Sequence, residues 1–391
     1  MSEQRAIARE LVRVSHGGAS VVLASVVRTV GTTYRGVGAR MIVRADNTTV
    51  GLLSGGCLEG ALVECAVRVR ERGEPEVVSY DGRSGDELIW GLGLGCNGLV
   101  EILLEPRSAA SAGALGALLD SALDDAAPGV LATVVRATGE GAPEIGARVL
   151  VRATVDVSRD GDWGRGAALG AVIADAQSGQ VSARRGMNLE YVLSPDVEGS
   201  LDDAVTLEIA FELVMPSIDI VICGSGPDVV PVARLATSLG WGVTVVDPRP
   251  VAFTPPERFG SARVVECGHS DCIGEVVSPS RRTAAVVMSH NYERDLDYLD
   301  GLARSDAAYI GVLGPRARTE RLLRDLDARG RPFPAPMAGR LFAPIGLDVG
   351  GDGAEAIALS IVAEIAAVMN GRAASHLSGR AESIHEMPAL A

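Results

Sequence analysis

Two cysteines in this chain lie where glycines leave the backbone open to a ligand. Cys57 follows Ser54-Gly55-Gly56 and comes just before a helix-like run over 58–70. A helix start presents free N–H groups and a partial positive charge, which favour anions and lower the pKa of a thiol. Cys57 is therefore a candidate reactive thiol, and the alternative is a buried structural cysteine at a strand–turn–helix corner. Cys96, in Gly95-Cys96-Asn97-Gly98, presents the same choice between a ligand contact and a small thiol in a tight turn.

A second group of candidate residues follows a buried-strand pattern over 218–223. Gly224 and Gly226 form a Gly-x-Gly turn, a helix-like run follows, and the next strand-like run ends at Asp247. In dinucleotide-binding units this arrangement brings glycine amides to the pyrophosphate and an acid to the ribose hydroxyls. We expect Asp247 to favour NAD over NADP, unless Arg249 reaches the 2′-phosphate.

Further polar residues of this half follow other strand-like runs. Ligands of such sheets bind at the carboxyl ends of the strands. His290 is therefore a candidate acid–base or anion-contact residue, and its alternative role is structural, as a helix cap. Tyr292 is a second candidate proton donor, and Arg316 and Asp348 also lie at expected strand ends.

The chain as a whole has the composition of a globular protein with more than one core. Its 391 residues exceed one ordinary domain. It contains no run of 18 apolar residues, which argues against a membrane-spanning helix, and its polar start lacks the apolar core of a signal peptide. The six cysteines show no regular pairing, which indicates a reducing compartment. We therefore expect a cytoplasmic protein.

The charged residues exclude several kinds of chemistry. The net charge of -14 argues against nucleic-acid binding. All 36 basic residues are arginine, so a lysine Schiff base and a P-loop lysine are excluded. Bound anions must be held by arginine, by helix starts or by glycine amides. No Cys-x-x-Cys or His-x-x-x-His spacing is present, so we expect no metal-ligating residues.

The first half of the chain repeats itself. Residues 132–153 are identical to 24–45 at half of the 22 positions, without a gap. This predicts two copies of one unit, over 24–106 and 132–216. The second copy has Ala142-Pro143 in place of Tyr34-Arg35 and lacks the Ser-Gly-Gly-Cys segment. We interpret the first copy as functional and the second as scaffold; the alternative is that both are scaffold.

These patterns predict an α/β protein of two domains. Residues 1–215 form an α/β domain built on the internal duplication, and residues 216–391 form a Rossmann-type parallel sheet with a C-terminal helix. We expect Pro106 and Pro216 to end the last strand of each copy and residues 154–168 to form an irregular loop. Further strands of the second domain are expected over 262–267, 283–289 and 307–313, and its long helix over 354–369.

Several segments together resemble the XdhC/CoxI family, the xanthine dehydrogenase accessory proteins. They are the turn over 31–40, Ser54–Glu59, Gly93–Cys96, Gly224–Asp228, Val245–Arg249, Tyr309–Gly314 and Ile345–Asp348. The resemblance covers nearly the whole chain and implies a role in molybdenum-cofactor maturation. Family members hold the molybdopterin cofactor, present it for sulfuration and pass it to a molybdenum hydroxylase. The implied partners are that client enzyme and a cysteine desulfurase, and we also expect a homodimer.

The implied cofactor carries an anionic phosphate and an oxo-molybdenum dithiolene, which suit arginines and a helix start. The expected cofactor contacts are Arg35, Arg40, Ser54, Gly55, Gly56, Cys96, Gly224, Gly226, Asp228, Asp247, Arg249, Arg316 and Asp348. The candidate catalytic residues are Cys57, His290 and Tyr292.

Two other functions compete with a chaperone that has no turnover of its own. One is a stand-alone NAD(P)-dependent oxidoreductase, with the nucleotide in the Rossmann half. The other, a purely structural partner, leaves the glycine-flanked cysteines without a purpose. These residues leave open whether the chain catalyses a reaction.

Overall fold

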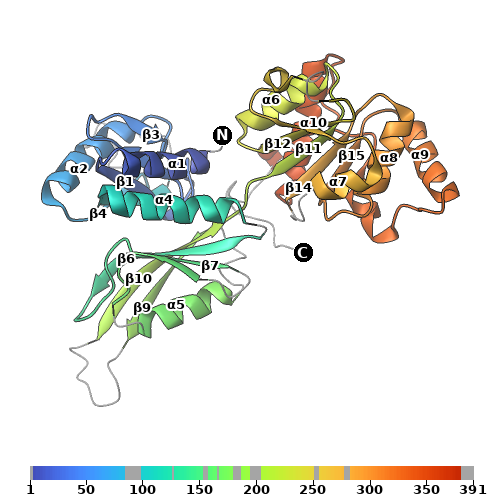
Figure 1. Cartoon of the computed structure of the whole chain (residues 1–391). Helices are drawn as coiled ribbons and strands as arrows, with labels where there is room; N and C mark the ends of the chain where they lie inside the picture. Colours follow the sequence, from blue (N-terminus) through green and yellow to red (C-terminus); the bar gives the residue numbers. More distant parts are fainter. Residues whose placement is uncertain are drawn as a thin grey trace. The chain divides into compact units, whose positions relative to one another are not determined.

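The computed structural model describes residues 3–83, 98–125, 127–152, 157–164, 167–178, 186–193, 204–250, 255–276 and 282–379. The chain forms two compact units, Glu3–Met215 and Pro216–His376. In Figure 1 the first unit runs from blue to green and the second from yellow to red.

The N-terminal unit contains two antiparallel sheets of five strands each. Their orders are β3-β2-β1-β5-β4 and β8-β7-β6-β10-β9, so the same arrangement occurs twice. The strands of the first sheet are β1 (Val21–Gly31), β2 (Arg40–Val43), β3 (Thr49–Gly51), β4 (Glu76–Asp81) and β5 (Gly98–Arg107). Those of the second are β6 (Gly129–Thr138), β7 (Arg148–Arg152), β8 (Val157–Asp160), β9 (Gly186–Leu193) and β10 (Val205–Val214). The helices are α1 (Glu3–His16), α2 (Glu59–Arg72), α4 (Ala109–Leu123) and α5 (Ala167–Gln177).

The two sheets also share their register. Ala24 lies opposite Met41 in the first sheet, and the equivalent Ala132 lies opposite Val149 in the second. Each copy thus has a helix before its first strand and another after its third strand. The predicted duplication of an α/β unit is confirmed.

Each sheet of this unit is covered on both faces. Residues of β1 alternate between two cores, because successive side chains of a strand point to opposite faces. Leu23 faces the core that α1 and α4 share, whereas Val22 and Ala24 face α2. Helix α5 covers the second sheet in the same way as α2 covers the first. The two sheets meet through the buried side chains Val27, Leu103, Val135 and Ala210.

Two local predictions in this unit are wrong. Strand β5 continues through Pro106 to Arg107, and β4 pairs with it only as far as Leu104. Pro106 therefore lies where one side of β5 has no neighbour, and a residue without an N–H group is tolerated there. Within the predicted loop over 154–168, β8 pairs with β7, and its Asp160 forms a buried ion pair with Arg107 at 2.8 Å.

Buried ion pairs connect the two copies reciprocally. Arg40 at the start of β2 pairs with Glu212 of β10, and Arg148 at the start of β7 pairs with Glu105 of β5. In both pairs Nη1 lies 3.0 Å from a carboxylate oxygen. Burial raises the pKa of Glu105, but the charges of Arg148 and Arg107 outweigh it and hold the pKa below its ordinary value.

The C-terminal unit is built on a six-stranded parallel sheet. Its order, β13-β12-β11-β14-β15-β16, is the 3-2-1-4-5-6 order of dinucleotide-binding folds, which confirms the predicted Rossmann type. The strands are β11 (Asp219–Cys223), β12 (Gly242–Asp247), β13 (Arg263–Glu266), β14 (Thr283–Val287), β15 (Tyr309–Val312) and β16 (Leu341–Phe342). The helices are α6 (Val229–Ser238), η3 (Pro256–Phe259), α7 (Ser270–Val276), α8 (Tyr292–Leu302), α9 (Arg316–Ala328), η4 (Ala335–Arg340), α10 (Ala354–Met369) and, after the unit, η5 (Leu377–Gly379).

Helices cover both faces of this sheet (Figure 1). Ile220 and Ile222 of β11 pack in the core under α6 and α10, and Val221 and Cys223 pack in the core under α7, α8 and α9. Such double covering accounts for the continuous apolar runs of the strands. Although α10 is strongly apolar, no helix in the described ranges is both long and apolar enough to cross a membrane.

Cys267 and Cys272 form a disulfide across the turn between β13 and α7. This corrects the expectation that the cysteines are unpaired. The sequence could not show it, because a separation of five residues brings two thiols together only when the turn folds back. Cys57, Cys65 and Cys223 are free thiols.

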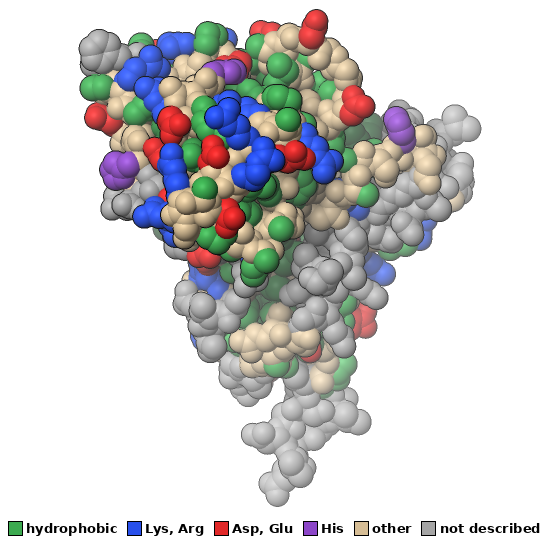
Figure 2. All heavy atoms as spheres, turned by 90° about the vertical axis from the view of Figure 1, so that its right-hand side faces the viewer, with side chains coloured by type: hydrophobic (Ala, Val, Ile, Leu, Met, Phe, Trp, Pro, Cys, Tyr) green, Lys and Arg blue, Asp and Glu red, His purple; other side chains and the backbone are tan. Residues whose placement is uncertain are grey.

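Figure 2 shows a face of the molecule on which arginine and acidic side chains are interspersed. Many of the exposed arginines lie next to carboxylates, as Arg329 does between Glu293 and Asp297. Positive charge on this face is therefore not gathered in one patch.

We expect Glu105→Gln to destabilise the protein by about 3–5 kcal/mol, because it leaves the buried Arg148 guanidinium without a countercharge and removes one of the two carboxylates of Arg107. The effect should exceed that of Glu212→Gln, since Glu105 pairs with two arginines and Glu212 with one. Urea unfolding at neutral pH measures both, and exposed Glu71→Gln on α2 is the control, with a change within about 0.5 kcal/mol. An equal or smaller loss for Glu105→Gln would contradict this ranking.

The pH dependence follows from the lowered pKa of Glu105. A group whose pKa is lower in the folded state stabilises the protein above its unfolded value, here about 4.5. This contribution decreases as the pH falls through the folded value. The difference in stability between the wild type and Glu105→Gln should therefore be complete at neutral pH and shrink in acid.

Candidate functional site

The turn between β1 and β2 carries the first group of predicted site residues. The Thr33 hydroxyl donates to the backbone carbonyl of Arg35 at 2.9 Å, which closes the turn. The Arg35 guanidinium forms an ion pair with Glu3 at the start of α1. Tyr34 stands out from the turn with half of its side chain exposed. The turn thus fixes a cation and an aromatic ring near the first helix.

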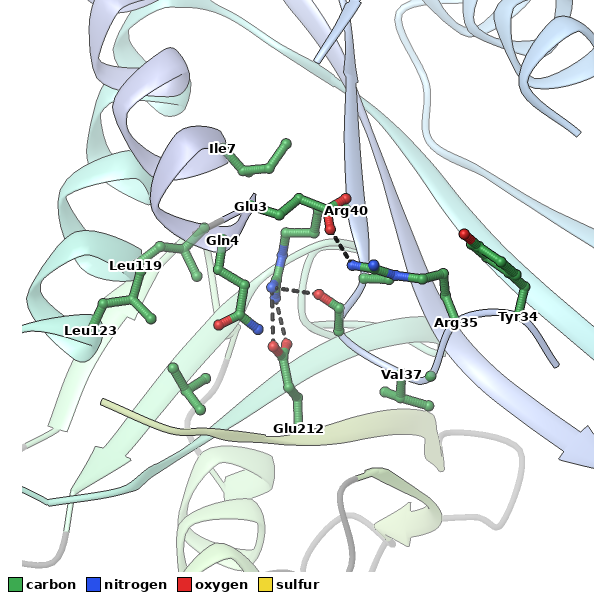
Figure 3. Close-up of a pocket in the computed structure, with 14 residues that line it drawn as sticks. Glu3, Gln4, Ile7, Tyr34, Arg35, Val37, Arg40, Leu119, Leu123 and Glu212 are labelled. Carbon is green, nitrogen blue, oxygen red and sulfur yellow. Dashed lines mark hydrogen bonds and ion pairs between the residues drawn. The ribbon is translucent and has the colours of Figure 1, made fainter. Parts of the chain in front are cut away.

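Arg35 and Arg40 line one pocket, with a volume of about 360 Å³ (Figure 3). Arg40 is buried and donates from Nη1 to Glu212 at 3.0 Å and to the carbonyl of Gly38 at 2.9 Å. Its Nε is buried without a hydrogen-bond partner. A side chain at position 38 would overlap the Glu212 carboxylate, so this close approach requires glycine. The other walls include Glu3, Gln4, Ile7, Leu119, Leu123 and Val214.

The loop before α2 is held by its own side chains. The buried Ser54 hydroxyl accepts a hydrogen bond from the amide of Leu58 at 3.0 Å and donates to Glu59. Glu59 in turn accepts from the amide of Ser54 at 2.8 Å. Burial raises the pKa of Glu59, and these hydrogen bonds lower it further than burial raises it. Ser54 and Glu59 therefore position the loop, as a helix-capping pair does.

Cys57 lies between this loop and the core of the first sheet. Its side chain is partly buried and packs against the apolar cluster beneath α2. A side chain built at Gly55 would lie 3.7 Å from the ring of Tyr34, so the loop and the pocket turn are neighbours. Ser54–Cys57 is not part of the pocket wall. Cys96 lies outside the described residues.

In the C-terminal unit, Gly224 lies where the strand order reverses, between β11 and β14. Its φ is 134°, and a side chain there would lie 2.7 Å from the carbonyl oxygen of Met288. A side chain at Gly226 would lie 2.5 Å from the Asp228 carboxylate. Close packing against the backbone and a positive φ thus require glycine at 224, and both glycines lie at the point where such folds bind ligands.

Asp228 and His290 form a pair beside this point. His290 Nε2 lies 2.7 Å from an oxygen of Asp228, and the other oxygen of Asp228 is buried without a hydrogen-bond partner. His290 has a φ of 58°, which non-glycine residues adopt rarely. A carboxylate that orients an imidazole is suited to proton transfer. The same carboxylate places negative charge next to Gly226, where a pyrophosphate would lie.

Asp247 is fully engaged by neighbouring side chains. It accepts hydrogen bonds from the Arg249 amide at 2.9 Å, from Arg249 Nε at 2.8 Å and from the Ser225 hydroxyl. Burial raises the pKa of Asp247, but the bonds from Arg249 and Ser225 lower it below its ordinary value. Its oxygens are therefore occupied where the sequence predicts contacts with ribose.

The other predicted residues of this unit have separate surroundings. The Tyr292 hydroxyl donates to Asp325 at 2.7 Å, and its pKa is raised by burial and by that bond. Arg316 is exposed and pairs with Glu320 on the next turn of α9 at 3.1 Å. Asp348 is exposed. Among the described residues, no group of three or more His, Cys, Asp or Glu side chains could hold a metal ion.

Glu3, Gln4 and Glu212 are pocket residues that the sequence analysis does not identify. Glu212 is one of the polar residues in the alternating apolar and polar pattern of 205–215, yet its carboxylate is buried against Arg40. One signal was available, because the last strand of each copy carries a glutamate near its end. Glu105 is the counterpart in the first copy.

Two family models match the chain. The model described as XdhC and CoxI family matches residues 15–81, and the XdhC Rossmann domain model matches residues 220–365. The chain is 28% identical over 344 residues to a probable xanthine dehydrogenase subunit of Bacillus subtilis (strain 168), covering 88% of this chain and 92% of that protein. A crystal structure of a xanthine dehydrogenase from Bacillus halodurans is similar with a TM-score of 0.68 and 26% identity, covering 96% of this chain and 98% of that one. The similarity extends over both units.

We expect Cys57 to react with iodoacetamide faster than Cys65 and Cys223. Cys57 is partly exposed beside a helix start, whereas the other two thiols are buried. Burial also raises the pKa of Cys223. Peptide mapping of the native protein over a time course measures the three rates. If Cys57 is the slowest, it is not an accessible thiol at this loop.

We expect Arg249→Ala to strengthen NAD binding by about fivefold, or roughly 1 kcal/mol. The change frees acceptor sites on Asp247 for ribose hydroxyls. It should weaken NADP binding, because it removes the cation next to the 2′-phosphate position. Calorimetric titration with both nucleotides measures the two affinities. The control is Arg263→Ala, because Arg263 begins β13 whereas Asp247 lies opposite the last residue of that strand. Unchanged or weaker NAD binding would show that the Arg249–Asp247 contact does not limit the site.

Proposed function

Because the chain belongs to the XdhC and CoxI family, we propose that it is an accessory protein of a xanthine-dehydrogenase-type molybdenum hydroxylase. It holds the molybdenum cofactor for sulfuration and passes it to that enzyme. The names of the relatives, which refer to xanthine dehydrogenase, support the association. A protein with this role needs a site that binds its cargo and leaves one end accessible for transfer.

The observation that carries the proposal is the open pocket of the N-terminal unit. Arg35 and Arg40, two of the arginines expected to contact the cofactor, line it together. Tyr34, at its edge, lies next to Gly55 of the loop that presents Cys57. Residues from separate parts of the sequence thus provide donors, an aromatic ring and a thiol in one region.

The residues of this region fit a molybdopterin in their chemistry. The amide of Gln4 is a donor and the carboxylate of Glu3 an acceptor for a polar ring edge. The side chains of Ile7 and Leu119 provide an apolar wall for a flat ring. When bound, the cofactor supplies the redox-active molybdenum that the client enzyme uses.

The chain's own residues would bind and orient the cargo. Arg40 is held by Glu212, so its position does not depend on the ligand. Ser54 and Glu59 hold the loop that carries Cys57, which fixes where its thiol can act. We propose the client hydroxylase and a cysteine desulfurase as partners, and the homodimer stays a prediction.

A second candidate function is an NAD(P)-dependent oxidoreductase, and the Asp228–His290 pair favours it. The pair lies at the reversal of strand order, where a nucleotide and its substrate would meet. His290 would be the proton donor, because the Tyr292 hydroxyl is directed to Asp325. Asp247 counts against this function, since Arg249 and Ser225 already occupy it.

We expect the purified full-length protein, when denatured, to release molybdopterin and not NAD or NADP. Mass spectrometry of the released small molecules measures this. Cys57→Ala should lower the amount retained by at least about tenfold, whereas Cys223→Ala, which removes a fully buried thiol of the other unit, should not. Release of a nucleotide without a pterin would favour the oxidoreductase. Release of neither from freshly purified protein would refute the cofactor-holding role.

A further inference from the structure

The two copies of the N-terminal unit form equivalent cavities of different size. The cavity beside Arg40 and Glu212 measures about 360 Å³, and the one beside Glu105 and Gly146 about 150 Å³. Glu105 and Glu212 occupy equivalent positions opposite the first strand of their copies. Since the backbones repeat, the difference must come from the surrounding side chains.

In the smaller cavity, beside Glu105, Arg107 of β5 and Asp160 of β8 fill the space. Arg107 Nη1 lies 2.8 Å from Asp160, Nε lies 2.6 Å from Glu105, and Nη2 donates to the carbonyl of Gly146 at 3.1 Å. Both side chains are buried. This Arg107–Asp160 pair is a plug that satisfies the polar groups of the cavity from within.

The larger cavity, between the β1–β2 turn and β10, lacks the plug. The strand registers show which residues take the place of the plug. Val214 stands two residues after Glu212, as Arg107 stands two residues after Glu105. Leu52 is the residue after β3 and is equivalent to Asp160, the last residue of β8. Neither Val214 nor Leu52 can reproduce the hydrogen bonds of the plug. Arg40 and Glu212 therefore remain on the wall of an open pocket (Figure 3).

The charges around the open pocket are balanced. Arg40 pairs with Glu212, and Arg35 pairs with Glu3. Anion sites keep positive charge free for the ligand, and here each guanidinium already has a carboxylate. The two ion pairs together carry no net charge, and the groups left for a ligand are carboxylate lone pairs and the Gln4 amide. Apolar side chains complete the walls.

We infer that this pocket takes the uncharged ring end of its ligand, a fused heterocycle with a 2-amino-4-oxopyrimidine edge, and that Leu52 and Val214 keep it open. Such an edge has two N–H donors and a carbonyl acceptor, which match a carboxylate next to a guanidinium or amide. Pterins and guanine share this edge. The choice of a pterin rests on the proposed function, whereas the recognition of the edge does not.

This placement leaves the anionic part of the ligand outside the pocket. Tyr34 lines the pocket and lies against Gly55, so the ring of Tyr34 connects the pocket to the loop before α2. The glycine amides and Cys57 of that loop are the groups suited to a charged or metal-bearing end. The two ends of the ligand are thus recognised by different chemistry.

The test introduces an equivalent plug into the open pocket. Leu52→Asp with Val214→Arg reproduces Asp160 and Arg107, and titration with pterin, followed by its fluorescence, measures binding to the full-length chain. We expect at least about tenfold weaker binding than in the wild type, with no effect of excess inorganic phosphate on the wild type. Val192→Arg, at an exposed position of β9, is the matched control and should bind as the wild type does.

Val214 is buried, so thermal unfolding must show that the double variant folds. If the double variant does not fold, Gln4→Trp is used in its place. This change fills the pocket from an exposed position on α1 and should weaken pterin binding in the same way. Binding of pterin that survives both changes, or that phosphate displaces, overturns the inference. Binding of guanosine as tight as that of pterin supports recognition of the edge.

The proposed function fails separately from this inference. If the plug abolishes pterin binding but the purified wild type releases no molybdopterin, the inference about the pocket stands. The cofactor-holding role is then refuted. Conversely, the wild type can release molybdopterin while the plug variant and Gln4→Trp retain the same amount. That result supports the cofactor-holding role and overturns the inference about the pocket.

Discussion

The reciprocal ion pairs between the duplicated sheets are the constraint on which the N-terminal unit depends. Arg40 reaches from the first copy to Glu212 of the second, and Arg148 reaches back to Glu105. A buried guanidinium needs its carboxylate in the right place, because an unpaired buried charge is strongly destabilising. The pairs therefore fix how the two copies sit against each other, while the apolar contacts between the sheets are less directional.

Duplication also explains how one half of this arrangement could acquire a function. The cavity beside Glu105 is closed by Arg107 and Asp160, which satisfy its polar groups from within. The cavity beside Glu212 has an ion pair of the same kind and lacks the plug, so the pair stays beside an open pocket. The two versions of one structure thus differ in whether the cavity is filled. Tyr34 and Arg35 line the open pocket, and the Ser54–Cys57 loop is next to Tyr34. The second copy has neither of these sequences.

Much of the fold could be predicted from the sequence, because periodicity and repetition are local signals. The order of strands and helices, the duplication and the Rossmann-type unit follow from them. The pairing of side chains far apart in the sequence does not, so Glu212 was not recognised as the partner of Arg40. The same limit applies to β8, since its Asp160 pairs with Arg107, a residue 53 positions away in the sequence. Among the predicted site residues, Arg35 and Arg40 do share a pocket, whereas Tyr292 and Arg316 have separate partners.

The C-terminal unit shows why a nucleotide-binding fold need not bind a nucleotide. Its glycines allow a close approach, but Asp228 places a carboxylate beside Gly226, and Asp247 is occupied by Arg249. An incoming nucleotide would have to displace hydrogen bonds to charged groups, each worth about 1.5–3 kcal/mol, before gaining its own. A chaperone has no need for that exchange, and the same sheet then serves as a rigid scaffold. The left-handed backbone of His290, held against Asp228 at the reversal of strand order, is a feature of this unit that a scaffold alone does not explain.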